Sequence, residues 1–344
     1  MKNKSKLLLD AILGISLQKE MVSLQYAYLS TVMALFDLHE AAVFNLIKSG
    51  ESDNLEQTIK FKNSDKYIDE RSKIIAVNAS VRQCINSKDI LIDELEHNSI
   101  HVFVPIMNQS SVISIICLKG DKNITSSLEE VRYISYIYGN FYALISESER
   151  DTLTGLYNRR TFDAKLAKML SVQKTVIHNE LGNIPGVEQR NLEVESCAWL
   201  VAVDIDFFKR VNDQFGHVAG DEVLLQLSQK MKECFRYTDL LFRFGGEEFV
   251  IVLEPVPYDK VWGALERFRQ MIEGHEFPLV GSITISTGFA GIREQDYPVT
   301  ILDYADKALY FAKEHGRNCI YSYEQLLESG KIVEQDVEGS IDLF

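Results

Sequence analysis

Hydrophobic residues recur at helical spacing in two stretches of the N-terminal half of the chain. Between residues 4 and 37 they return every three or four positions, and a second run follows Ser126. The second run has the steps of three and four that are typical of a coiled-coil seam, and its apolar members are Leu128, Val131, Ile134, Tyr138, Phe141 and Ile145. Such a seam is expected either in a helix that packs on its own domain or in a helix that pairs two copies of the chain.

Shorter runs with the composition of strands lie between these two helical stretches. They cover residues 40–47, 55–61, 100–107 and 111–119, and a helical stretch is predicted near 72–86. The order helix, strands, helix, strands predicts an α+β domain with a largely antiparallel sheet.

The C-terminal half shows a different pattern. An almost continuous apolar run over 200–208 predicts a buried strand, and a helix is expected from Asp221. Two strand-like runs within 240–253 flank a Gly-Gly pair, which indicates a hairpin. Helix, strand and helix follow, the last ending at Gly316. We therefore expect an α/β fold in which helices cover a central sheet.

The length of 344 residues is that of about two domains. We place the boundary near Glu149, where polar residues and a glycine end the seam. The predicted organisation is a regulatory or dimerisation domain over 1–148 with an exit helix at 126–148, a second domain over 149–324 with a long loop at 171–197, and an acidic tail over 325–344.

Charge and cysteine content narrow the classes of function. The chain has 36 basic and 50 acidic residues and a net charge of −14, which argues against nonspecific nucleic-acid binding and against docking on anionic membranes. No stretch has the roughly 18 consecutive apolar residues of a membrane span. The five cysteines form no CxxC pair, so we expect free thiols and a cytoplasmic protein.

Four carboxylates mark a candidate site. Asp204 and Asp206 end the predicted buried strand and point to the same face, and Glu247 and Glu248 directly follow the Gly-Gly pair. If the hairpin lies beside the strand, these acids repel one another unless a cation lies between them, and oxygen ligands favour Mg²⁺ or Mn²⁺. Two such ions can assist phosphoryl transfer. A solvated acidic turn is the competing interpretation.

The residues around these acids resemble a known family. RFGGEEF (243–249) is similar to the signature of the GGDEF family of diguanylate cyclases, in its GGEEF form. Four further segments resemble family motifs in the same order: DTLTGLYNRRTF (151–162), VDIDFFKRVNDQFGHVAGDEVL (203–224), TISTG (284–288) and ADKALYFAKEHGRN (305–318). The resemblance covers about 151–323. It implies a fold like the palm of nucleotidyl cyclases and polymerases, and an enzyme that condenses two GTP into cyclic di-GMP and two pyrophosphates.

The resemblance also implies roles for the acidic residues. Asp204 and Glu247 would bind the metal ions, two per site, with help from the backbone carbonyl of Ile205. Glu247 would also help to deprotonate the ribose 3′-hydroxyl, with Glu248 as an additional acidic neighbour. Asp206 fits the pattern but is not assigned as a ligand. Gly245 and Gly246, which lack a Cβ atom, would let the triphosphate approach the backbone.

Further residues are assigned to the nucleotide in the same way. Asn212 and Asp221 would read guanine, since a carboxylate accepts both N–H donors on one edge of this base; Asp221 is also a candidate helix N-cap. Lys313 and Arg317, taken to be four apart on one helical face, would bind phosphate, and Lys209 would add positive charge. The alternative is that this basic pair lies on a solvated helix face and binds no ligand.

Two regulatory features are predicted. Arg236 and Asp239 form an RxxD pattern ahead of the Gly-Gly pair, where family members have a product-inhibition site. The N-terminal half coarsely resembles a GAF-type sensor domain with an unknown small-molecule or protein input, although a dimerisation module without a ligand is the alternative. We expect a Mg²⁺-dependent diguanylate cyclase that acts as a homodimer. The alternative is an inactive receptor that binds cyclic di-GMP through RxxD.

Overall fold

The computed structural model divides the chain into two compact units, Met1–Ser148 and Glu149–Phe344. The residues that the structure describes are 9–10, 12–36, 38–49, 52–62, 67–69, 73–95, 99–108, 110–167, 169–170, 197–293 and 297–333. The predicted long loop at 171–197 lies outside the described residues, apart from Cys197.

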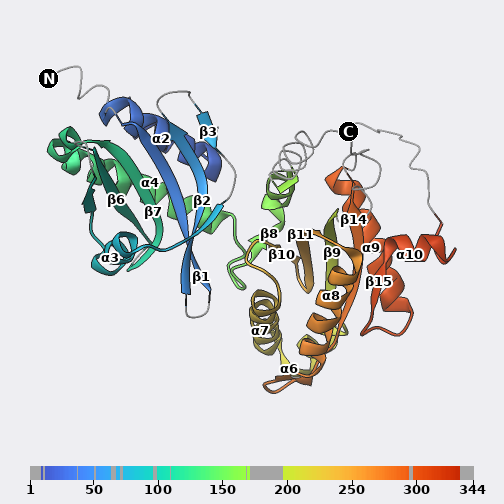
Figure 1. Ribbon diagram of the computed structural model, residues 1–344. Coiled ribbons are helices and arrows are strands. Elements are labelled where there is room, and N and C mark those ends of the chain that lie inside the picture. The colour runs from blue at the N-terminus through green and yellow to red at the C-terminus, as the bar shows by residue number, and fades with distance from the viewer. Residues whose placement is uncertain are drawn as a thin grey trace, which may run out of the picture. The chain divides into compact units, whose positions relative to one another are not determined.

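The N-terminal unit is built on a curled antiparallel sheet (Figure 1). Its strand order is β3-β2-β1-β7-β6-β5, and β4 also pairs with β2. The elements are α2 (Met21–Phe36), β1 (Glu40–Ser49), β2 (Ser52–Lys62), β3 (Tyr67–Asp69), β4 (Lys73–Ala76), α3 (Ala79–Ser87), β5 (Leu91–Glu94), β6 (Ser99–Asn108), β7 (Ser111–Asp121) and α4 (Leu128–Ser148).

Helices cover both faces of this sheet. The helices α2 and α4 pack on one face around residues such as Leu29, Ile134 and Val104, while α3 packs on the other through Val81 and Cys84. The Tyr28 and Ser135 hydroxyls share a hydrogen bond of 2.7 Å that joins α2 to α4 inside the core. Alternating burial along β6 and β7 thus feeds two separate hydrophobic clusters.

The predicted seam of α4 lies in the core of its own unit. Val131, Ile134, Tyr138 and Ile145 are at most 6% exposed and pack against α2 and the sheet. These residues therefore cannot form a coiled coil with a second chain while the unit is folded. The opposite face of α4 exposes Tyr133, Tyr136 and Leu144 by 61–69%.

Two predicted helices have different bounds. The stretch near 72–86 begins with strand β4, which pairs with β2, and α3 starts only after Asn78, whose side chain accepts a hydrogen bond from the Val81 N–H (2.8 Å). In the N-terminal stretch, residues 18–20 are not helical, and α2 begins at Met21. Apolar spacing alone did not reveal these interruptions.

The C-terminal unit is a mixed α/β domain around a six-stranded sheet with the order β15-β14-β9-β11-β10-β8 (Figure 1). The strand β9 lies antiparallel between β14 and β11. The elements are β8 (Tyr157–Asn158), β9 (Cys197–Ile205), α6 (Phe208–Phe215), α7 (His217–Cys234), β10 (Leu240–Gly245), β11 (Glu248–Val256), α8 (Tyr258–Glu273), β12 (Glu276–Phe277), β13 (Gly281–Ser282), β14 (Ile285–Ile292), α9 (Pro298–Glu314), β15 (Ile320–Ser322) and α10 (Tyr323–Glu328).

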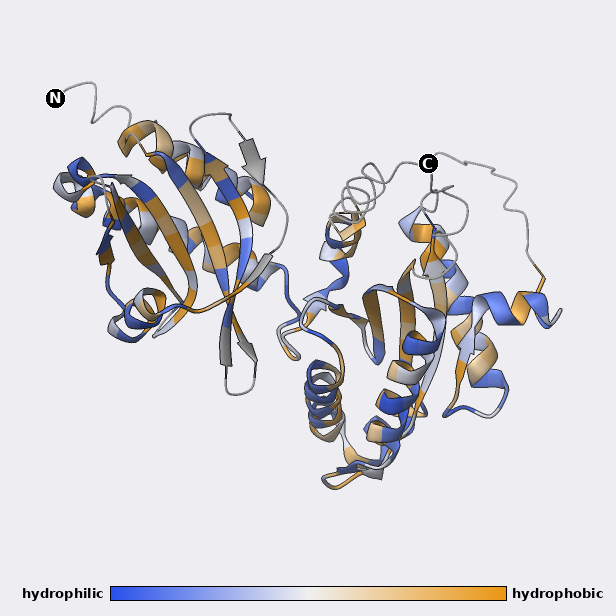
Figure 2. Cartoon of the chain, in the orientation of Figure 1, coloured by the Kyte–Doolittle hydropathy of each residue, from blue (hydrophilic) through white to orange (hydrophobic). Residues whose placement is uncertain are grey.

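The two faces of this sheet carry separate cores. Val201 and Val203 of β9 face α7 and α8, whereas Leu200 and Ala202 face α9. The strands are largely hydrophobic and α7 and α8 largely hydrophilic in Figure 2, as expected for helices that shield a buried sheet. The even-numbered positions of β9 thus lead towards α9.

Helix α9 lies unusually close to β14. A Cβ atom at Gly288 would lie 2.0 Å from the backbone nitrogen of Leu309 and 2.3 Å from the carbonyl oxygen of Ala305, so only glycine fits. The facing residues of α9 are small, with Ala305, Ala308 and Ala312 all buried. This contact sets the distance between α9 and β14, the strand next to β9.

Two predictions about the C-terminal unit are wrong. Helix α7 begins at His217 rather than Asp221, with Gly216 as its N-cap. The first residues of the predicted acidic tail, from 325, belong to helix α10. Tyr323 and Leu326 hold this short helix in place because they are buried against α9 and β14. No helix within the described ranges combines the length and the apolar character that a membrane span needs.

Candidate active site

Asp204 lies near the end of β9 on the face covered by α9. The residue is only 4% exposed, and its Oδ2 atom lies 2.7 Å from Nζ of Lys313 on α9. In the sheet, Asp204 is flanked by Glu248 of β11 and Ser286 of β14. The prediction that the hairpin acids lie beside the buried strand is therefore confirmed by the strand register.

The Gly-Gly turn, residues 245–248, connects β10 to β11. Gly246 has a φ of 51°, in the left-handed region that favours glycine. The Arg243 guanidinium donates two hydrogen bonds to the carbonyl oxygen of Gly246 (2.9 and 3.2 Å) and one to Asp151 (3.0 Å). Arg243 thus holds the turn against the start of the C-terminal unit.

Burial and mutual repulsion govern the electrostatics of the acids. Burial raises the pKa of Asp204. Lys313 lowers this pKa, whereas the negative charges of Glu248 and Asp206 raise it further. Burial also raises the pKa of Glu247, and the nearby Asp204 adds to this increase. Both carboxylates are thus costly to ionise without additional positive charge.

The donor set suits a hard cation. Asp204 and Glu247 provide carboxylate oxygens. The Ile205 side chain is buried in the core, so only the backbone carbonyl of this residue can act as a metal ligand. Among the described residues, no group of three or more His, Cys, Asp and Glu side chains is arranged to hold a metal. A ligand set here therefore needs the backbone carbonyl in addition to the two carboxylates.

The two residues assigned to guanine lie at the junction of α6 and α7. A Cβ atom at Gly220 would lie 2.0 Å from Oδ1 of Asn212, so glycine admits the Asn212 side chain at this corner. Asp221 is exposed and is the fifth residue of α7. It is therefore not the N-cap of the helix, and its carboxylate faces solvent.

The two basic residues assigned to phosphate do not share a helix. Helix α9 ends at Glu314, and Arg317 follows with a φ of 59°. The prediction of one helical face is wrong because Gly316, with a φ of 112°, turns the chain. The Arg317 guanidinium nevertheless comes near the site, since its Cζ atom lies 4.5 Å from the ring centre of Phe207, directly after Asp206.

The remaining assigned residues are Lys209 and the two residues of the RxxD pattern. Lys209 is exposed on α6. Arg236 and Asp239 form a turn between α7 and β10, in which the Asp239 carboxylate accepts a hydrogen bond from the Arg236 N–H (2.8 Å). The five residues Leu240–Phe244 of β10 separate this turn from the Gly-Gly turn, a path of roughly 17 Å.

Three residues that shape the candidate site were not assigned a role from the sequence. Arg243 supports the Gly-Gly turn, and Asp206 and Phe207 form the turn that follows β9. Arg243 is part of the quoted run RFGGEEF, so its position carried a signal. The partners of Asp206 lie 78 to 112 residues away in sequence, and no local pattern identifies them.

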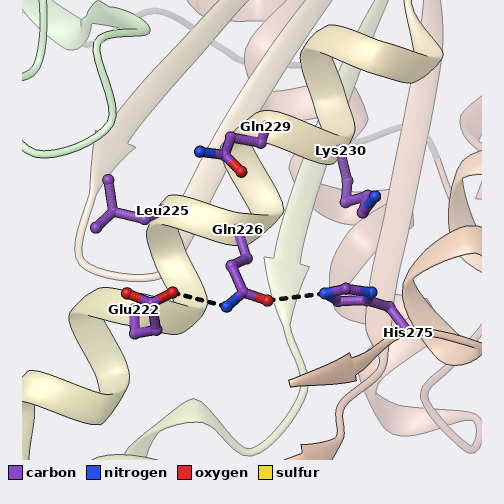
Figure 3. A pocket seen from close by; sticks show the side chains of 6 residues that line it. All are labelled: Glu222, Leu225, Gln226, Gln229, Lys230 and His275. Atoms are coloured by element: carbon purple, nitrogen blue, oxygen red, sulfur yellow. Dashed lines mark hydrogen bonds between the residues drawn. The ribbon is translucent and has the colours of Figure 1, made fainter. Parts of the chain in front are cut away.

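An open hollow of about 370 Å³ lies elsewhere, on the outward side of α7 (Figure 3). A hydrogen-bond chain crosses it from Glu222 through Gln226 to His275 (2.7 and 2.8 Å). It contains none of the assigned residues, so the carboxylate edge remains the candidate site.

Comparison with known proteins identifies this unit. Residues 186–319 match the family model described as "Diguanylate cyclase, GGDEF domain". These residues are a GGDEF domain. The GGDEF domain holds all the carboxylates of the candidate site as well as Lys313 and Arg317.

Curated relatives match about half of the chain. The response regulator PleD of Caulobacter vibrioides is 31% identical over 203 residues, which are 57% of this chain and 41% of PleD. The diguanylate cyclase DgcP of Pseudomonas aeruginosa is 36% identical over 171 residues, 49% of this chain and 23% of DgcP. The chain thus spans less than half the length of either relative.

Solved structures of such domains resemble about half of the chain. The GGDEF domain of DgcB from Caulobacter crescentus, crystallised in complex with c-di-GMP, is 28% identical, with a TM-score of 0.43, over 51% of this chain and 96% of that chain. The active GGEEF domain of a diguanylate cyclase from Vibrio cholerae is 31% identical, with a TM-score of 0.38, over 48% of this chain and 96% of that chain.

Proposed function

We propose that this chain is a Mg²⁺-dependent diguanylate cyclase, which condenses two GTP into cyclic di-GMP and two pyrophosphates. The observation that carries the proposal is the group of Asp204, Glu247 and Lys313 at one end of the sheet. The pKa values of both acids are raised, which suits groups that await a cation, and Lys313 supplies positive charge beside them. The GGDEF match and the named cyclases among the relatives support the same reaction.

In each half of the reaction, a ribose 3′-oxygen bonds to the α-phosphorus of the other GTP, and the bond from that phosphorus to the pyrophosphate breaks. Mg²⁺ or Mn²⁺, held by Asp204, Glu247 and the Ile205 carbonyl, would stabilise the negative charge on the transferring phosphoryl group. Glu247, whose pKa is raised, accepts the proton of the 3′-hydroxyl. Glu248 adds negative potential that keeps the site selective for cations.

The same proposal gives each basic and polar residue a task. Lys313, Arg317 and Lys209 bind the triphosphate, and the Gly-Gly turn lets the phosphates approach the backbone. The exposed Asp221 carboxylate accepts both N–H groups of the guanine edge, and Asn212 supports it from α6. Adenine has no such pair of donors on this edge, so GTP is preferred.

The reaction joins two nucleotides, and each GGDEF domain has one set of these residues, so we propose a homodimer. The exposed face of α4 is the surface we assign to it: Tyr133, Tyr136 and Asn140 are three and four residues apart, and Leu144 follows. An Asn within such a stripe favours a parallel two-stranded pair. Because α4 ends at Ser148, its pairing would tether two GGDEF domains at high local concentration.

We further propose that the N-terminal unit is a GAF-like regulatory domain that responds to a small molecule or a protein. The support is its curled antiparallel sheet with helices on both faces.

Arg236 and Asp239 are proposed to bind the product and inhibit the enzyme. The exposed Arg236 side chain supports this, because its guanidinium is open to phosphate and guanine edges.

The decisive experiment is an assay of the purified full chain with GTP and MgCl₂, with the nucleotides separated by chromatography. We expect cyclic di-GMP and pyrophosphate in a ratio of one to two, and neither product from Asp204→Asn. Tight binding of cyclic di-GMP without any turnover would instead identify the inactive receptor and contradict the proposal.

A further inference from the structure

Asp206 is a nearly buried carboxylate that the proposed chemistry leaves without a task. It is 5% exposed and follows β9 directly. Its Oδ1 atom accepts a hydrogen bond from the Ser286 hydroxyl (2.6 Å), and its Oδ2 atom accepts from the Thr284 hydroxyl (2.7 Å) and from the Asn318 N–H (2.9 Å). Its own N–H donates to the carbonyl oxygen of Thr284 (2.9 Å). With three donors on its two oxygens, Asp206 already has the partners that a buried charge requires.

These hydrogen bonds reach the segment that carries Arg317. Arg317 and Asn318 both have left-handed backbone conformations, with φ values of 59° and 48°. Such conformations are unfavourable for residues with a Cβ atom and persist where the surroundings hold them. Asp206 holds the Asn318 backbone, while the Asn318 side chain contacts Arg269 and Glu273, each at 2.7 Å. The position of this segment is therefore fixed from two directions.

Phe207 gives the Arg317 side chain a surface to lie on. The Cζ atoms of Arg317 and Arg210 lie 4.5 and 4.4 Å from the centre of the Phe207 ring. An aromatic ring within about 6 Å of a guanidinium attracts it and limits its freedom. The turn after β9 thus contacts the Arg317 segment twice, through the Asp206 carboxylate at the backbone and through the Phe207 ring at the guanidinium.

We propose that Asp206 and Phe207 are positioning residues that hold Arg317 in place for the GTP triphosphate. The inference rests on the proposed function, in which Arg317 binds phosphate. It assigns Asp206 to the orientation of an arginine and not to the metal ions. Arg317 then loses little freedom when GTP binds, because its backbone and its guanidinium are already fixed. The alternative is that Asp206 only stabilises the fold.

The experiment measures binding of the α,β-methylene analogue of GTP to the full chain by calorimetry, together with KM and kcat for GTP. We expect Asp206→Asn to raise the Kd and the KM about tenfold, in the range of a charge-assisted hydrogen bond to phosphate, and to change kcat less than twofold. In an Arg317→Ala background, Asp206→Asn should cause no further loss of binding. Such non-additivity shows that Asp206 acts through Arg317.

Glu324 provides a matched control. Its carboxylate accepts hydrogen bonds from the Gly291 N–H and the Ser322 hydroxyl, both 2.7 Å, so it also links β14 to a neighbouring segment. Glu324→Gln should lower the thermal midpoint without changing the Kd of the analogue. A purely structural role predicts that Asp206→Asn behaves in the same way, or that its effect is undiminished in Arg317→Ala, and either result would overturn the inference.

Phe207→Leu tests the inference independently of Asp206 and covers the case in which Asp206→Asn does not fold. It keeps an apolar side chain but removes the ring, and we expect a three- to fivefold rise in Kd that is absent in Arg317→Ala. An unchanged Kd would contradict the role of Phe207. Failure of the wild-type chain to bind the analogue would instead count against the proposed function, so the two failures are distinguishable.

Discussion

The sheets of the two units differ in the polar groups that they bury. In the N-terminal unit, the buried polar side chains among the described residues are neutral, such as Gln57, Thr58 and Ser114. In the GGDEF domain, two carboxylates are buried at the end of one strand, Asp204 and Asp206. A sheet that only needs to fold has no use for such charges, and their position agrees with the chemical task that we propose for this edge of the sheet.

Two of the neutral groups, Thr58 and Ser114, are satisfied by the neighbouring strand of the sheet. Thr58 and Ser114 donate hydrogen bonds to carbonyl oxygens of β1, at 3.2 and 2.8 Å. The carboxylates have side-chain and backbone partners from α9, β14 and the segments beside them: Lys313 for Asp204, and Thr284, Ser286 and Asn318 for Asp206. Burial of a charge contributes little to stability even when it is paired, so the stability of the domain does not explain these acids.

The largest effect is expected at the acids that we propose to be catalytic. Glu247→Gln keeps the volume of the side chain but removes one charge and the proton acceptor, so we expect the rate of cyclic di-GMP formation to fall at least about a hundredfold. The thermal midpoint should stay the same or rise, because the repulsion by Asp204 is lost. Glu233→Gln, at an exposed position on α7, is the control. Normal turnover by a folded Glu247→Gln variant would contradict the proposed role of these acids in the reaction.

The next effect tests the neutral core of the N-terminal unit. Ile134 is 1% exposed, so Ile134→Glu would bury an unpaired charge, and we expect this unit to lose about 4 kcal/mol or more in its free energy of unfolding. Tyr136 is 69% exposed, so Tyr136→Glu should leave the fold intact and weaken self-association. Circular dichroism and sedimentation velocity measure the two outcomes. Normal folding of Ile134→Glu would show that the seam is not core.

A smaller effect is expected at the RxxD turn. Arg236→Ala removes paired hydrogen bonds from an exposed guanidinium, which are worth about 1.5–3 kcal/mol when they are made to charged groups. The concentration of cyclic di-GMP that halves activity should therefore rise about 10- to 100-fold while the initial rate stays unchanged. Initial rates at increasing product concentration measure this. An uninhibited wild type would refute the site.

The smallest effect concerns pH and Mg²⁺. The pKa of Asp204 is raised in the fold, so the native state keeps a proton that the unfolded chain loses near pH 4, and stability falls as the pH rises through this interval. A bound cation replaces the proton, so Mg²⁺ should raise the thermal midpoint by a few degrees at pH 8 and by less at pH 5. Asp204→Asn should lose this difference. An equal shift at both pH values would contradict it.

Local patterns predicted the parts of the molecule whose causes are local. The Gly-Gly turn and the acids around it follow from a strand, a hairpin and their register, and all three are visible in the sequence. The seam of α4 was ambiguous because a helix buried in its own unit and a helix buried against a copy need the same spacing. Lys313 and Arg317 were assigned to one helical face because they are four residues apart, whereas the helix ends at Glu314 and Gly316 turns the chain before Arg317.

Other features depend on contacts between distant residues. The role of Asp206 is set by partners on β14 and after α9, and the packing of α10 depends on two side chains, Tyr323 and Leu326. The close approach of α9 to Gly288 is likewise invisible until both elements are placed. The GAF-like character of the N-terminal unit, the homodimer and the residue roles at the site stay predictions.

The hydrogen bonds of Arg243 connect the Gly-Gly turn to the start of the C-terminal unit. Asp151 lies three residues after the end of α4 at Ser148, and one guanidinium joins its carboxylate to the carbonyl oxygen of Gly246. Within the C-terminal unit, one side chain therefore connects its first residues to the turn that carries Glu247. In the proposed cyclase, a displacement of Asp151 would thus be transmitted to the turn that carries Glu247 without any rearrangement of the sheet.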